Sequence, residues 1–210
     1  MDIFFIIALV VTSIVTVAFL VERGLALRWH KVIPPAVAHA VENYQTDSDL
    51  PRLRGVAEAN PSALSRLLLF ASDHLEWPRS ENRELIETRA RHEMTLLERG
   101  LVVLEIIVGI APLLGLVGTI YGLITLFSSM TSTATGADTA KFSAGISLAL
   151  NATLLGLLIA IPSLVGWSYY NKKVENLGIE MASLCEEFLR KHYRTQETVA
   201  SLAEAGGRGL

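Results

Sequence analysis

From residue 106 the chain reads Ile106-Ile-Val-Gly-Ile-Ala-Pro-Leu-Leu-Gly-Leu-Val-Gly-Thr-Ile-Tyr-Gly-Leu-Ile-Thr-Leu-Phe127. No charged side chain occurs between Glu105 and Asp138, and a helix needs only about 20 apolar residues to cross a bilayer. Small residues recur every three or four positions and so share one helical face: Ala111, Gly115, Gly118, Thr119 and Gly122. Such a face lets another helix approach closely in lipid. The pattern predicts a membrane-spanning helix that packs against other helices.

The composition indicates a membrane protein with several spans. Hydrophobic residues make up 51% of the 210 positions and charged residues only 19%. Most of the charge lies in two blocks, 22–99 and 172–208, separated by apolar sequence. The net charge of −3 gives no indication of nucleic-acid binding. The single Cys185 cannot form an internal disulfide, and no metal-ligand spacing surrounds it.

Three apolar runs, 3–21, 101–130 and 142–171, are predicted to be transmembrane helices. A cleaved signal peptide is the alternative for the first run, but it needs a basic start, and Met1-Asp2 has none. The positive-inside rule places the N-terminus outside, because basic residues follow the first and third runs: Arg23, Arg28, Lys31, Lys172 and Lys173. Residues 131–141 then form a periplasmic loop.

The charged segments are predicted to be helical and cytoplasmic. In 24–99, Pro35 begins one helix, a turn from Thr46 precedes the next, Ser62 caps a third, and Trp77-Pro78 ends it. From Ser80 we expect one helix that continues into the second span, with Gly100 as its only weak point.

The segment 172–210 is predicted to be a cytoplasmic helix and tail. It carries an apolar stripe at three- and four-residue spacing: Val174, Leu177, Met181, Leu184 and Phe188. We favour packing of this stripe on the 24–99 domain over a separate coiled coil. The sequence therefore predicts an all-α integral membrane protein whose three transmembrane helices extend into a cytoplasmic helical domain.

Polar side chains inside the predicted spans are few, and in hydrocarbon each needs a partner or a water-filled path. Thr119 and Thr153 each lie on the small-residue face of their span, so the two faces can meet and line a path for a small cation. Thr125 and Ser147 are interpreted as bonding back to their own helices. Neither the second nor the third span has a titratable group in its middle, so proton transfer needs an acid from a partner.

Glu105 has two interpretations, which the residues alone leave open. It is either an entry or exit carboxylate at the cytoplasmic mouth of a path, or an interfacial carboxylate that is hydrated or paired with Arg99. We see no phosphate-binding loop, no Ser/His/Asp set and no metal-ligand cluster. The sequence therefore predicts neither an enzyme nor a bound cofactor.

Two motifs resemble those of the MotA/TolQ/ExbB proton channel family. Residues 111–122, Ala-Pro-Leu-Leu-Gly-Leu-Val-Gly-Thr-Ile-Tyr-Gly, resemble the family's second-span motif. Residues 145–162, Gly-Ile-Ser-Leu-Ala-Leu-Asn-Ala-Thr-Leu-Leu-Gly-Leu-Leu-Ile-Ala-Ile-Pro, resemble its third-span motif. The three-span layout is similar to the ExbB/TolQ branch, and the wording of the second-span motif favours an ExbB-like protein.

The resemblance implies a homopentamer in a bacterial inner membrane, surrounding a dimer of single-span ExbD- or TolR-like proteins. The partner span would carry a protonatable aspartate that faces Thr119 and Thr153. Proton flow would then drive a TonB- or TolA-like protein that acts on the outer membrane. Asn151 and Glu105 complete the expected ion pathway. The residues expected to pack against the partner are Ala111, Pro112, Gly115, Gly118, Gly122, Gly145, Ala149 and Gly156.

One position departs from the family pattern. Many ExbB and TolQ proteins have a glutamate where this chain has Leu148, so the role of that glutamate does not carry over. Sodium coupling, with Thr119, Thr153 and Asn151 as ligands, is a less favoured alternative. A TolQ-like role in envelope integrity and a non-conducting membrane scaffold are the others.

Overall fold

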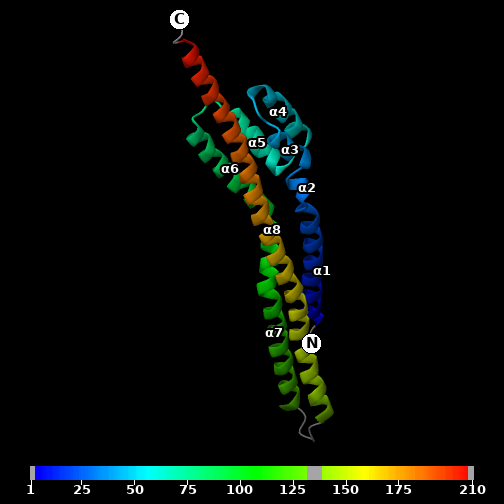
Figure 1. Cartoon of the computed structure of the whole chain (residues 1–210). Helices are drawn as coiled ribbons and strands as arrows, with labels where there is room; N and C mark the ends of the chain where they lie inside the picture. Colours follow the sequence, from blue (N-terminus) through cyan, green and yellow to red (C-terminus); the bar gives the residue numbers. More distant parts are fainter. Residues whose placement is uncertain (1–2, 132–138, 208–210) are drawn as a thin grey trace. The chain divides into compact units, whose positions relative to one another are not determined.

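The computed structural model describes residues 3–131 and 139–207, with side chains described over 4–128, 142–143 and 145–195. Within these ranges the chain forms helices and no strand (Figure 1). It divides into two compact units. Unit 1 comprises Met1–Leu25 and Gly100–Asn171, and unit 2 comprises Ala26–Arg99 and Lys172–Leu210.

Unit 1 contains the apolar helices. These are α1 (Ile3–Ala26), α7 (Leu101–Thr131) and the first part of α8 (Thr139–Gly207). Segments of all three are long and apolar enough to cross a membrane: Phe4–Ala26, Leu101–Ser128 and a portion of Gly145–Thr195. This confirms the prediction of an all-α chain with three helices that could span a membrane. Most of the predicted 131–141 loop, residues 132–138, lies outside the described residues.

Close approaches fix the helix directions within unit 1. A Cβ built on Gly122 would lie 3.0 Å from the Ala149 Cβ, and one on Gly156 would lie 2.6 Å from the Ala111 carbonyl oxygen. Residue numbers therefore rise along α7 as they fall along α8, so the two helices are antiparallel.

Helix α1 runs parallel to α8. Ser163 Oγ lies 3.3 Å from Thr16 Oγ1, and the Tyr170 hydroxyl donates to the Leu20 carbonyl at 2.8 Å. Because α7 is antiparallel to both α1 and α8, the N-terminal end of α1 lies at the same end of unit 1 as the C-terminal end of α7. This arrangement agrees with the predicted topology, in which the N-terminus and the 131–141 loop share one side of the membrane.

Unit 2 consists of helices, several of which begin at the predicted signals, whereas α5 ends at Asp73, four residues before the predicted stop at Trp77-Pro78. They are α2 (Trp29–Val32), α3 (Pro35–Glu42), the 3-10 turn η1 (Asp47–Asp49), α4 (Leu50–Ala59), α5 (Ala63–Asp73), α6 (Arg79–Glu98) and the later part of α8. Ser62 caps α5 by accepting a hydrogen bond from the Ser65 N–H at 3.1 Å. Thr46 and Asp49 form a capping box, which confirms the predicted turn.

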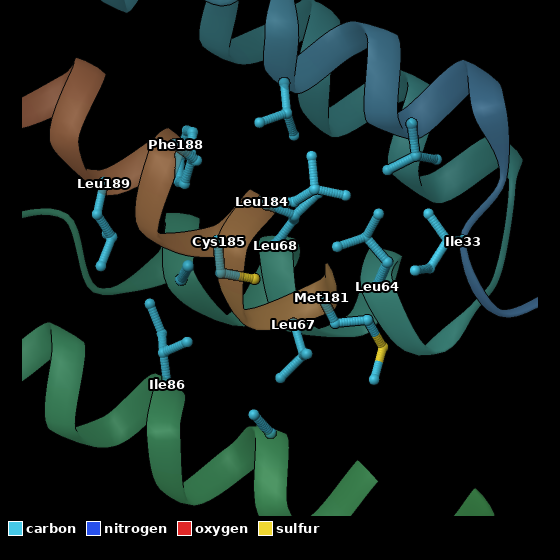
Figure 2. Close-up of a cluster of buried hydrophobic side chains, with 14 of the residues drawn as sticks. Ile33, Leu64, Leu67, Leu68, Ile86, Met181, Leu184, Cys185, Phe188 and Leu189 are labelled. Carbon is cyan, nitrogen blue, oxygen red and sulfur yellow. The ribbon is translucent and has the colours of Figure 1, made fainter. Parts of the chain in front are cut away.

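The core of unit 2 forms around α8. Leu177, Met181, Leu184 and Phe188 are buried among side chains of the preceding helices, including Leu64, Leu67, Leu68 and Ile86 (Figure 2). The predicted stripe therefore packs on the earlier segment, as we favoured. Residues more than 80 positions apart in the chain build this one core.

Two buried polar residues of α6 were not foreseen. Asn82 donates to the His74 carbonyl at 3.0 Å and to the Tyr193 hydroxyl at 3.2 Å. Glu93 is fully buried, and both of its carboxylate oxygens accept from the Arg66 Nε, at 3.1 and 3.0 Å. They share a face with Ile86, so the face of α6 toward the core is partly polar.

The prediction of one uninterrupted helix from residue 80 into the second span was wrong. Helix α6 ends at Glu98 and α7 begins at Leu101, with a turn at Arg99-Gly100. The Arg23 guanidinium lies against Gly100, in the space that a Cβ would occupy. Only glycine leaves that space free, and glycine is also the residue that weakens a helix most after proline.

Candidate functional site

Thr119 of α7 and Thr153 of α8 meet through their hydroxyl groups, which are hydrogen-bonded to each other. Each hydroxyl also reaches the opposite helix backbone. Thr119 Oγ1 lies 3.1 Å from the Ala149 carbonyl oxygen, and Thr153 Oγ1 lies 3.2 Å from the Gly115 carbonyl oxygen, so either hydroxyl can donate across the contact. Ala149 lies one turn before Thr153, and Gly115 lies one turn before Thr119, so each threonine reaches the backbone one turn before its partner. The structure thus brings these two residues together, and their place in an ion pathway stays a prediction.

The pair has three possible orders of hydrogen bonding. Thr119 Oγ1 also lies 3.2 Å from the Gly115 carbonyl oxygen of its own turn. Thr119 can donate to Thr153, which then donates to Gly115, or Thr153 can donate to Thr119, which then donates to either Ala149 or Gly115. A hydroxyl donates and accepts at once but does not ionise near neutral pH. The pair can therefore relay or ligate a cation but cannot store a proton.

Small residues make this contact possible. A Cβ on Gly115 would lie 2.8 Å from the Ala152 carbonyl oxygen and 2.9 Å from the Thr153 Cα, which are backbone atoms that cannot move aside. A Cβ on Gly118 would lie 2.9 Å from the Ala152 Cβ. Most of the predicted helix-packing residues lie in the contact between α7 and α8 of the same chain: Ala111, Gly115, Gly118, Gly122, Ala149 and Gly156.

The remaining predicted packing residues lie at the edges of this contact. Gly145 faces the side chain of Leu126, and Pro112 is half-buried within α7. Because proline lacks an N–H, it removes one hydrogen bond from the backbone of α7. The helix nevertheless extends through it from Leu101 to Thr131.

The structure does not bring Asn151 or Glu105 to the threonine pair. Asn151 is exposed, and because it precedes Thr153 by two positions it points about 200° away around α8. Glu105 is exposed in the first turns of α7, far along the helix from Thr119. Thr125 donates to the Tyr121 carbonyl of its own helix at 2.9 Å, as predicted.

Sequence reasoning missed a second polar contact inside unit 1. Thr16 and Ser163 are both buried, and Ser163 Oγ lies 3.3 Å from Thr16 Oγ1 while also donating to the Ile159 carbonyl at 2.8 Å. The only signal in the sequence was a hydroxyl residue within each apolar run, which does not identify its partner. This contact holds α1 against α8 in the way that polar side chains join helices in lipid.

In the described part of the chain, no three His, Cys, Asp or Glu side chains are grouped so that they could hold a metal ion. The cavities of unit 2 are open and shallow; one of about 310 Å³ lies between α6 and α8 and is lined by Ile86, Ala90, Ile179 and Cys185 among others. At the threonine pair the available groups are hydroxyl and carbonyl oxygens.

Comparison with known proteins identifies a family. A model of the MotA/TolQ/ExbB proton channel family matches residues 62–183, which include both threonines. Putative biopolymer transport protein ExbB-like 3 of Synechocystis is 31% identical over 169 residues, covering 73% of each chain. ExbB-like 1 of the same organism is 34% identical over 166 residues, and an ExbB homolog of Methanothermobacter thermautotrophicus is 32% identical over 148 residues.

The match covers these relatives to different extents. It includes 75% of this chain but 63% of the ExbB-like 1 protein, and 70% of this chain but 51% of the Methanothermobacter protein. The chain thus spans about half to three quarters of the length of these curated relatives.

Proposed function

The chain belongs to the MotA/TolQ/ExbB proton channel family, and we propose that it is the pore-forming stator subunit of a motor driven by the proton-motive force. We propose that it forms a homopentamer around two single-span partner chains. Unit 2 is assigned to the cytoplasm and the N-terminus to the outside, because Arg23, Arg28 and Lys31 follow α1 directly.

The observation that carries this proposal is the hydroxyl pair. Thr119 and Thr153 join two candidate spans at mid-length, and both side chains are half-exposed, so an edge of the pair is accessible from outside the chain. A polar edge on an apolar helix pair requires a polar partner in the membrane. We propose that this edge faces the ion pathway.

The partner must supply the titratable group. The sequence has no charged residue between Glu105 and Asp138, and none from Phe142 to Asn171. A protonatable aspartate in an ExbD- or TolR-like span would complete the site, with the threonine hydroxyls as its hydrogen-bond partners. Glu105 is proposed to serve the cytoplasmic mouth. The motion of the partner would be passed to a TonB- or TolA-like protein that acts on the outer membrane.

Proton flux tests the role of the pair. The complex, purified from its own membranes with its partner, is reconstituted in vesicles carrying an internal pH dye. Thr119→Val and Thr153→Val should each reduce flux at least about tenfold, because a hydrogen bond to a charged group contributes about 1.5–3 kcal/mol. Thr125→Val is the matched control, since its hydroxyl bonds only within α7 among the described residues.

Two results would change the assignment. Unchanged flux in both threonine variants, with the complex intact, would indicate a scaffold without conduction at this site. Flux that depends on sodium and not on pH would indicate sodium as the coupling ion. Native mass spectrometry in mild detergent checks the assembly, for which we expect five copies of this chain with two partner chains, each carrying an acid in its span.

A further inference from the structure

Trp77 is an exposed aromatic residue on the connection between α5 and α6, and side chains of unit 2 hold this connection in place. Trp77 is 45% exposed. The Tyr193 hydroxyl donates to the Trp77 carbonyl at 2.7 Å, and the Asn82 amide donates to the His74 carbonyl at 3.0 Å. Tyr193 and Asn82 are both buried. The tryptophan is therefore presented from a fixed backbone.

The Trp77 ring ends a row of aromatic rings that begins on α5. The His74 ring packs edge-on against it, with centroids 5.1 Å apart, and lies 4.6 Å from the Phe70 ring. His74 Nδ1–H donates to the Phe70 carbonyl at 2.8 Å, which orients the imidazole between the two rings. Phe70 and His74 are half-buried. Each ring limits the rotation of the next, so the row loses little entropy when a partner binds.

Two arginines extend this surface beyond Phe70. The Arg89 guanidinium lies over the Phe70 ring, 5.9 Å from its centroid. Arg66 and Arg89 share the buried carboxylate of Glu93, Arg66 through hydrogen bonds and Arg89 through an ion-pair contact of 3.5 Å. Their side chains are 48% and 40% exposed. We call the following five residues the Trp77 surface: Arg66, Phe70, His74, Trp77 and Arg89.

The Trp77 surface has more hydrogen-bond donors than acceptors. The Arg89 Nε–H and the Trp77 indole N–H have no acceptor among the described residues. Arg66 uses Nε and one Nη on Glu93, and its other Nη donates to no described residue. Arginine and tryptophan side chains carry donors only. A partner for this surface must therefore supply acceptors, and the fork of a guanidinium matches a carboxylate best.

We propose that the Trp77 surface binds an acidic segment of another protein, with Trp77 as the apolar anchor and the two arginines as partners of its carboxylates. Tryptophan and arginine are the residues that most often dominate the energy of protein interfaces. Of the three rings only Trp77 is exposed, whereas insertion into a lipid surface needs a broad apolar face. The inference concerns unit 2 alone and does not depend on ion conduction.

Peptide binding tests the proposal. The complex is purified from its own membranes into phosphatidylcholine nanodiscs and titrated into a fluorescein-labelled peptide of Asp, Glu and Leu, with fluorescence anisotropy as the readout. A peptide in which Lys replaces Asp and Glu is the charge control. We expect saturable binding of the acidic peptide alone, and weaker binding as the salt concentration rises.

Substitutions locate the binding. Trp77→Ala should weaken it at least about fivefold, as expected for an anchor residue. Arg89→Gln should weaken it about tenfold, because a hydrogen bond to a charged group is lost, and Arg89→Lys should restore only part, because lysine lacks the fork. Glu76→Gln should strengthen binding, since it removes an exposed carboxylate next to Trp77 in the sequence.

Two variants serve as matched controls. Trp29→Ala removes a tryptophan that is 43% exposed and flanked by basic residues, and Arg83→Gln removes an exposed arginine of α6. Both should leave the affinity unchanged, and thermal unfolding midpoints show whether each variant is folded. Equal losses in control and test variants, or no saturable binding of the acidic peptide, would overturn the proposal. Binding of phosphatidylglycerol vesicles but not of the peptide, lost in Trp77→Ala, would assign the surface to lipid and also overturn it.

Discussion

Tyr44 and His192 are hydrogen-bonded, with the tyrosine oxygen 2.9 Å from the imidazole Nδ1, although 148 positions separate them in the chain. Both residues are buried in unit 2, and the Tyr44 ring also packs edge-on against Phe188. Asp47 Oδ1 lies 2.9 Å from the same imidazole nitrogen. Burial, reinforced by Asp47, raises the pKa of Tyr44, so its hydroxyl remains protonated and available as a donor.

Removing the Tyr44 hydroxyl should weaken unit 2. Tyr44→Phe keeps the ring contact and deletes one buried hydrogen-bonding group, so we expect the free energy of unfolding to fall by about 1 kcal/mol. Denaturant titration in mild detergent, followed by circular dichroism, measures this. His39→Ala, which removes an exposed partner of Glu42, should change stability by less than about 0.5 kcal/mol. Equal effects of the two variants would contradict the buried role of Tyr44.

Glu93 should be the most costly acidic residue to remove from α6. Its carboxylate is buried, and its hydrogen bond raises the pKa of the Arg66 guanidinium, which stays charged beside it. Breaking a buried ion pair removes about 3–5 kcal/mol, and half-exposure of Arg66 reduces our expectation for Glu93→Ala to about 2 kcal/mol. Glu87→Ala, in an exposed pair with Arg83, should have a negligible effect in the same titration.

Adding one methyl group at Gly115 should separate α7 from α8. The new Cβ would meet the backbone of Ala152 and Thr153, so Gly115→Ala should reduce stability by about 2 kcal/mol, the middle of the range for overpacking. A lower midpoint of thermal unfolding in detergent would show this. Gly109→Ala is the matched control on the same helix, because its Cβ would meet nothing within 4 Å. Stable folding of both variants would contradict the close approach.

The cap at Asp49 should make unit 2 sensitive to acid. The N–H groups of Gln45 and Thr46 each donate to the Asp49 carboxylate at 3.1 Å and hold its pKa below the usual value. A lowered pKa stabilises the fold above the ordinary value of about 3.9 and ceases to do so as the pH falls through the folded value. Asp49→Ala should therefore lower the unfolding midpoint at pH 7, with a difference from wild type that closes as the pH falls through the lowered pKa of Asp49. A constant difference would exclude this linkage.

Local signals in the sequence predicted much of the fold. The caps at Thr46 and Ser62 and the proline at the start of α3 depend on neighbours within a few positions, and these were found where expected. The turn at Arg99-Gly100 was missed; there the guanidinium of Arg23, which lies 77 positions earlier, lies against Gly100. Glu93 and Asn82 were missed for a related reason, since a polar residue in a core is recognised only when its distant partner is known.

The residues of the candidate site show the same difference between local signals, which predicted contacts, and distant partners, which did not. Helical periodicity placed Thr119 and Thr153 on the small faces, and those faces meet. The same periodicity could have separated Asn151 from Thr153, because positions two apart point to nearly opposite sides of a helix. The contact between Thr16 and Ser163 needed the pairing of α1 with α8, which no local pattern in either run reveals.

The core of unit 2 has a consequence for how the chain is made. Residues 26–99 leave the ribosome first, but the side chains that complete their core, from Leu177 to Tyr193, follow 72 residues of unit 1. At about 5–20 residues per second, this delay lasts roughly 4–14 s. During that time the α8 side chains that cover Leu64, Leu67 and Leu68 in the finished core have not yet been made. Translation order thus requires the earlier part of unit 2 to wait until unit 1 has been synthesised before its core can be completed.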